Sequence, residues 1–247
     1  MRDTRIVMGM PVTVDVAGPS GAALVESVFT YFNRVDRRFS TYRPDSEISA
    51  INAGRLSIAD SSDQMREVLA IAENTRQQTD AFFDIRTPSG GLDPSGIVKG
   101  WAIRNAARQV ALAGARDYFI DAGGDIQSSG VNHAGGEWTI GIRNPFDAAV
   151  LIKVLYPRGR GIATSGTYVR GQHIYNPHEP GRPIEDIVSL TVIGPDVLEA
   201  DRFATAAFAM GKAGIGFIEQ MAGLEGYVVD RTGRATFTSG FAEYCAS

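Results

Sequence analysis

The 247-residue chain has a single cysteine, Cys245, near its C-terminal end. One thiol excludes both an internal disulfide and a cysteine-rich metal site. No apolar run approaches the roughly 20 residues that a membrane-spanning helix needs. The chain also has no basic tract or basic helix, and its net charge is -4 with a pI near 5.4. This charge pattern argues against nucleic acid as a partner.

Internal repeats, low-complexity segments and a Pro/Ser-rich linker are also missing. Hydrophobic residues make up 44% and charged residues 21% of the chain, which is ordinary for a globular protein. We therefore predict one α+β domain over residues 1–247, with an antiparallel or mixed sheet and packed helices. The first 16 residues alternate like a strand and do not resemble a signal peptide, so we expect a cytoplasmic protein.

Hydrophobic periodicity and helix-capping residues locate the elements. Helices are predicted over 20–35, 46–54, 62–78, 93–112, 195–211 and 214–221. Strands are predicted over 5–16, 82–85, 117–120, 137–145, 149–157, 163–169 and 187–194, followed by a hairpin over 226–238.

The helix over 195–211 carries a polar pair, Asp201 and Thr205, on a face rich in alanine. Residues four apart stand one turn above each other on a helix. A carboxylate beside a hydroxyl suits a hard cation with oxygen ligands. Alternatively, the pair is an ordinary acid beside a threonine that bonds back to its own helix. These two residues alone favour the second interpretation.

Lys99 lies in the early turns of the helix over 93–112, where a cation opposes the helix dipole. Its position makes sense if it meets an anionic ligand, although a solvated surface lysine is the alternative. The Gly123-Gly124 turn after the strand over 117–120 can present backbone N–H groups to a ligand. That turn lacks the spacing of a dinucleotide fingerprint or a phosphate-binding loop.

Eight short motifs occur in an order that resembles one family, the ApbE-like FAD:protein FMN transferases. The final helix and the Lys-Gly motif are the most specific of them. The motifs are Met8-Gly9, FSTYRPDSEISAIN, Phe83-Asp84, DPSGIVKGWAI, DAGGDI, TSGTY, HIYNP and EADRFATA.

The resemblance implies binding of FAD and Mg²⁺, and transfer of the FMN half onto a Thr or Ser hydroxyl of a target protein with release of AMP. It implies that Asp201, Thr205 and the backbone near Gly96 hold the metal. His173 would carry the proton, since an imidazole titrates near neutral pH, and Lys99 would add positive charge. The implied flavin-site residues are Met8, Tyr42, Phe82, Phe83, Asp84, Asp93, Lys99 and Ile174.

The chain departs from the family pattern in four places. Met10 stands where the family usually has Thr, and Asn176 replaces an Asp close to His173. The loop that follows reads HEPGRP and lacks the usual Thr-Gly, and only eight residues separate Asp84 from Asp93. Two alternatives to protein modification therefore stay open: an FAD-binding protein and an FAD pyrophosphatase.

Overall fold

The computed structural model describes all residues except 19, 88–89, 167–173 and 247. Within this described part, eight strands form one antiparallel sheet in the order β1-β2-β3-β4-β7-β8-β9-β10. The strands of this sheet are β1 (Arg2–Val7), β2 (Met10–Val16), β3 (Tyr118–Ala122), β4 (Asp125–Ser129), β7 (Gly161–Gly166), β8 (Ile187–Gly194), β9 (Glu225–Asp230) and β10 (Ala235–Phe237).

The two remaining strands, β5 (Ile140–Asn144) and β6 (Asp147–Leu155), pair with each other in a separate ribbon, and Leu155 also forms an isolated bridge with Cys245. The helices are α1 (Gly21–Phe39), α2 (Glu47–Asn52), α3 (Asp63–Gln78), α4 (Ser95–Leu112), α5 (Val197–Ala209) and α6 (Gly214–Gln220), with short 3₁₀ turns η1 (Gly211–Ala213) and η2 (Phe241–Tyr244). These elements confirm the predicted α+β class.

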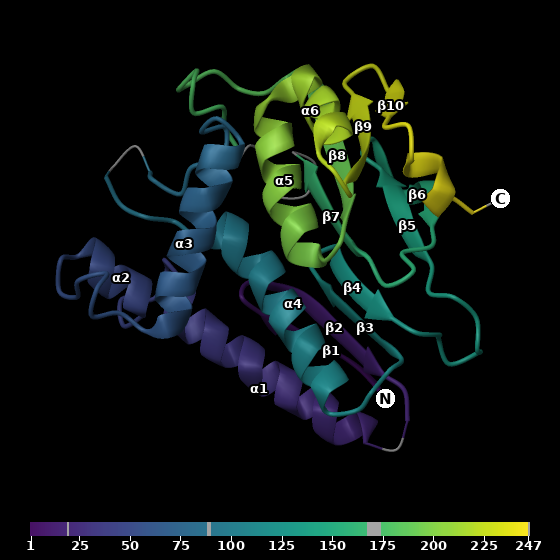
Figure 1. The fold of residues 1–247 in the computed structure, drawn as a ribbon, viewed down its shortest axis with the longest axis horizontal. Coiled ribbons are helices and arrows are strands. Elements are labelled where there is room, and N and C mark those ends of the chain that lie inside the picture. Colours follow the sequence, from purple (N-terminus) through teal and green to yellow (C-terminus); the bar gives the residue numbers. More distant parts are fainter. Residues whose placement is uncertain (19, 88–89, 167–173, 247) are drawn as a thin grey trace.

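Helices cover one face of the sheet, and the β5–β6 ribbon packs against the other face. Ala163 on β7 packs in the apolar cluster beneath α5, whereas its neighbour Ile162 packs in the cluster that includes the ribbon. Val192 and Ile193 on β8 divide in the same way. Successive strand side chains point to opposite faces, and Figure 1 shows α1, α4 and α5 together across one side of the strands.

Three predicted helix starts are confirmed by their caps. The side chains of Ser46, Ser62 and Asp196 accept hydrogen bonds from backbone N–H groups of Ser49, Met65 and Glu199. These bonds satisfy donors that the first helical turn leaves without a partner. In residues 1–18, 20–87, 90–166 and 174–246, no helix is long and apolar enough to cross a membrane.

The prediction of one continuous strand over 5–16 is wrong. Met8 and Gly9 have φ angles of 55° and 72°, and they form a turn between β1 and β2. A positive φ is uncommon for a residue other than glycine, so the alternating sequence conceals the turn. The break places Met8 at the tip of the β1–β2 hairpin.

The predicted strand over 82–85 is also absent. Asp80 and Ala81 both have positive φ angles, so the chain leaves α3 through a tight turn. The nearest strand-like pairing follows this segment and is an isolated bridge from Arg86 to Leu92. Conversely, β4 was not among the predicted strands, although it extends directly from the Gly123-Gly124 turn.

Candidate active site

The first half of α4 packs closely on α5 because two glycines of α4 face that helix. A Cβ added to Gly100 would lie 2.9 Å from Cβ of Asp201 and 2.9 Å from Cα of Leu198. One turn earlier, a Cβ on Gly96 would lie 2.9 Å from the Phe83 ring and 3.8 Å from Cγ2 of Thr205. The structure therefore brings together Gly96, Asp201 and Thr205, the three residues predicted to hold a metal.

A buried cluster of charges lies at this helix contact. The Lys99 ammonium is 2.6 Å from Oδ2 of Asp125 and 3.6 Å from Oδ1 of Asp201. Both carboxylates are buried, with Asp125 1% and Asp201 3% exposed. The backbone N–H of Gly100 donates to Oδ2 of Asp201 at 2.9 Å. These partners explain why a lysine stands early in α4, where the helix dipole disfavours it.

Burial governs the protonation of Asp201. It raises the pKa of this carboxyl to about 8, against the opposing effect of the Lys99 ammonium. The Asp125 carboxylate raises the pKa of Asp201 further. Removing a carboxylate from water disfavours its charged form, and a second negative charge nearby adds to the cost. Additional positive charge at this place would restore the ionised form of Asp201.

The residues present fit a magnesium ion. Among the described residues, no group of three or more His, Cys, Asp or Glu side chains forms a metal-binding cluster. The three residues predicted to hold the metal, Asp201, Thr205 and Gly96, would instead supply a carboxylate, a hydroxyl and a backbone oxygen. Hard cations prefer such oxygen ligands. Asp201 and Asp125 are both buried beside Lys99, so a bound cation would offset the cost of ionising Asp201.

Asp125 is a site residue that the sequence prediction missed. It starts β4 directly after the Gly123-Gly124 turn, and its Oδ1 accepts a hydrogen bond from the backbone N–H of Thr164 at 3.1 Å. The sequence did contain a signal, because a carboxylate that immediately follows paired glycines sits where the backbone can approach a ligand. The contact of Asp125 with Lys99, by contrast, joins two elements far apart in the chain, so no sequence spacing predicts it.

Three predicted flavin-site residues, Phe82, Phe83 and Ile174, pack near α4 or α5. Phe83 is buried with its ring edge against Gly96. Phe82 and Ile174 pack against the same apolar cluster beneath α5, and the Phe82 ring lies 4.4 Å from the ring of His178. The side chain of Asn176 accepts from the backbone N–H of His178 at 2.9 Å and so shapes the loop that follows Ile174.

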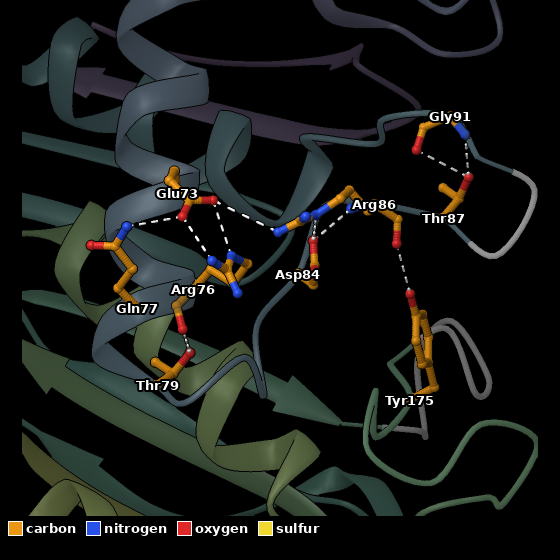
Figure 2. A network of polar contacts seen from close by, with 9 residues as sticks. All are labelled: Glu73, Arg76, Gln77, Thr79, Asp84, Arg86, Thr87, Gly91 and Tyr175. Atoms are coloured by element: carbon orange, nitrogen blue, oxygen red, sulfur yellow. Dashed lines mark hydrogen bonds and ion pairs between the residues drawn. The ribbon is translucent and has the colours of Figure 1, made fainter.

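A polar network surrounds Arg86, two residues after Asp84 (Figure 2). Arg86 contacts two carboxylates. Its Nε is 3.1 Å from Oδ1 of Asp84, and its Nη2 is 3.7 Å from Oε2 of Glu73 on α3. The Tyr175 hydroxyl donates to the Arg86 carbonyl at 3.3 Å. Burial raises the pKa of Tyr175, and the Asp84 and Asp93 carboxylates raise it further.

The remaining predicted residues lie elsewhere. Met8 is half-buried at the β1–β2 turn and packs against the apolar cluster that contains Phe83. Tyr42 is 96% exposed on the loop after α1. His173, the candidate proton carrier, lies outside the described residues, as does the end of the predicted strand over 163–169.

The family model that matches this chain is that of the ApbE family, over residues 8–89 and 86–228. The chain belongs to the ApbE family. A FAD:protein FMN transferase of Escherichia coli (strain K12) is 32% identical over 175 residues, which cover 67% of this chain and 49% of that protein. A FAD:protein FMN transferase of Vibrio cholerae is 35% identical over 131 residues, 49% of this chain and 39% of that protein.

The chain thus spans about half the length of the curated relatives it matches, or less. Solved ApbE structures share its fold. The flavin transferase ApbE from Vibrio cholerae superposes with a TM-score of 0.87 at 23% identity, covering 99% of this chain and 98% of that one. The apo flavinyl transferase ApbE of Pseudomonas stutzeri gives a TM-score of 0.85 at 25% identity, covering 99% and 96%.

Proposed function

We propose that this ApbE protein transfers the FMN half of FAD onto a Thr or Ser hydroxyl of an acceptor protein, with Mg²⁺ and with release of AMP. The observation that carries the proposal is the buried contact of Lys99 with Asp125 and Asp201, beside Gly96 and Thr205. Such a concentration of charge in a buried place costs folding free energy. Binding of a highly charged ligand, such as a diphosphate with its metal, would account for keeping these buried charges despite their cost to folding.

Asp201, Thr205 and the backbone carbonyl of Gly96 would hold the metal. When bound, Mg²⁺ neutralises negative charge on the diphosphate and acts as a Lewis acid toward its oxygens. Lys99 supplies a second positive charge, held in place by carboxylates on β4 and α5. Because cleavage of a phosphoanhydride depends on positioning and charge neutralisation, these residues supply the main requirements of the reaction.

In the proposed reaction, the acceptor hydroxyl oxygen attacks the phosphorus of the FMN phosphate. The bond between that phosphorus and the oxygen bridging to AMP breaks, and AMP leaves. The hydroxyl proton passes to a base, a role that we assign to His173 from the HIYNP motif. Phe82, Phe83 and Tyr42 supply aromatic surfaces for the rings of FAD.

Product analysis tests the proposal against both alternatives. The purified protein is incubated with FAD and either Mg²⁺ or EDTA, with and without Thr- and Ser-containing acceptor peptides. Transfer gives AMP together with a covalently flavinylated acceptor. Equal amounts of free FMN and AMP would instead show a pyrophosphatase, and intact FAD under every condition would show a binding protein.

A further inference from the structure

Asp125 occupies the point where three parts of the fold meet. The turn before it is closed by Asp121, whose Oδ1 accepts from the Gly124 N–H at 2.8 Å. Both glycines of the turn have positive φ angles, 63° at Gly123 and 97° at Gly124. This conformation is readily available to glycine alone, and the chain that leaves it carries a buried carboxylate.

The Asp125 carboxylate takes the place of a backbone acceptor where the pairing of β4 with β7 ends. Strands β4 and β7 pair at two positions: Ile126 pairs with Ile162, and Gln127 pairs with Gly161. Beyond that pairing, the backbone N–H of Thr164 donates to Oδ1 of Asp125. The other oxygen, Oδ2, contacts the Lys99 ammonium on α4. The Asp125 side chain therefore links β4 to β7 through Thr164 and also contacts the ammonium of Lys99 on α4.

The two carboxylates near Lys99 are not equivalent. Its ammonium is 2.6 Å from Asp125 but 3.6 Å from Asp201, a candidate metal ligand. Without the charge of Asp125, the ammonium would gain most by closing on Asp201, because attraction between buried opposite charges rises as they approach. A lysine paired tightly with Asp201 competes with a cation for the same carboxylate.

We propose that Asp125 is a positioning residue that holds the Lys99 ammonium away from Asp201 and so leaves Asp201 free to bind a divalent cation. The relevance of this inference to FMN transfer rests on the proposed function. Its physical content is narrower, because it concerns the competition of one lysine and one cation for one carboxylate. That competition is measurable without turnover.

The test uses Mn²⁺ as a probe, with its binding followed by electron paramagnetic resonance in the absence of FAD. Asp125→Asn keeps an acceptor for the Thr164 N–H but loses the charge, and we expect it to bind Mn²⁺ at least tenfold more weakly than the wild type. Lys99→Met should keep wild-type affinity or exceed it. The double variant should regain the affinity that Asp125→Asn loses, because no lysine remains to occupy Asp201.

Asp121→Asn is the matched control, since it alters an acid of the same turn that has no contact with Lys99 among the described interactions. We expect its Mn²⁺ affinity to stay within twofold of the wild type. If Asp125→Asn does not fold, Asp125→Ser takes its place under the same criteria.

Wild-type Mn²⁺ affinity in Asp125→Asn, or a double variant as weak as the single one, would overturn the inference. Absence of Mn²⁺ binding to the wild-type protein would overturn it too. Failure of the proposed function has a different signature: FAD stays intact in the product analysis while the Mn²⁺ series still shows loss and recovery.

Discussion

The backbone N–H of Gly100 donates a hydrogen bond of 2.9 Å to Oδ2 of Asp201, across the contact between α4 and α5. The same glycine leaves no room for a side chain, because an added Cβ would lie 2.9 Å from the backbone of Leu198. Helix packing and the orientation of a candidate metal ligand therefore depend on one small residue.

Gly100→Ala should force the two helices apart. Overpacking of a buried contact costs about 1–3 kcal/mol, and the shift would also disturb the hydrogen bond to Asp201. Urea unfolding measures the loss of stability. The control is Gly216→Ala on α6, where an added Cβ meets nothing within 4 Å. That variant should be as stable as the wild type or gain up to about 1 kcal/mol from helix propensity. Equal stability of the two variants would contradict the tight contact.

Tyr31 should make the protein sensitive to alkali. Burial raises the pKa of its phenol from 10.0 to about 12. The folded state favours the neutral phenol, so this contribution to stability is complete below pH 10 and is lost as the pH rises from 10 toward 12. At pH 11 the loss of stability amounts to about 1.4 kcal/mol.

Tyr31→Phe removes the titrating group while keeping the buried ring. Between pH 9 and pH 11, the free energy of unfolding of the variant should therefore fall by less than that of the wild type. Urea unfolding at the two pH values gives the comparison. Identical losses in both proteins would show that Tyr31 does not titrate as its burial indicates.

Tyr42 tests whether the flavin site extends to the loop after α1. Its side chain is 96% exposed, so Tyr42→Ala should leave the midpoint of thermal unfolding unchanged. If the ring stacks on FAD, the variant should bind FAD about tenfold more weakly, since such stacking contributes roughly 1–3 kcal/mol. Quenching of flavin fluorescence measures the affinity. Leu112→Ala, which removes another exposed side chain far along α4, should bind FAD normally. Unchanged affinity in Tyr42→Ala would exclude this residue from the site.

Local sequence signals predicted every α-helix that the described residues form. Ser62 and Asp196 act through hydrogen bonds within one turn, so their effect is visible in the sequence. The turn at Met8 was missed because a positive φ at methionine follows from tertiary context and carries no composition signal. The absent strand over 82–85 has a similar cause, namely the positive φ angles at Asp80 and Ala81.

The candidate site was predicted in part for the same reason. Asp201 and Thr205 lie one turn apart on a single helix, so their spacing alone pairs them. The partnership of Lys99 with Asp125 joins α4 to β4, and only the folded sheet brings these residues together. The sequence left Lys99 open between an anionic ligand and a solvated surface position, and nothing in it pointed to Asp125 as a partner.

The most direct test of the central claim is the fate of FAD in the presence and absence of Mg²⁺, measured with the wild-type protein and with Asp201→Ala. We predict that the wild type releases AMP only when Mg²⁺ is present, and that flavin appears covalently on the acceptor in equal amount. Asp201→Ala should release no AMP while keeping a thermal unfolding midpoint close to that of the wild type. FAD that stays intact with the wild type and Mg²⁺, or normal AMP release by Asp201→Ala, would contradict the account.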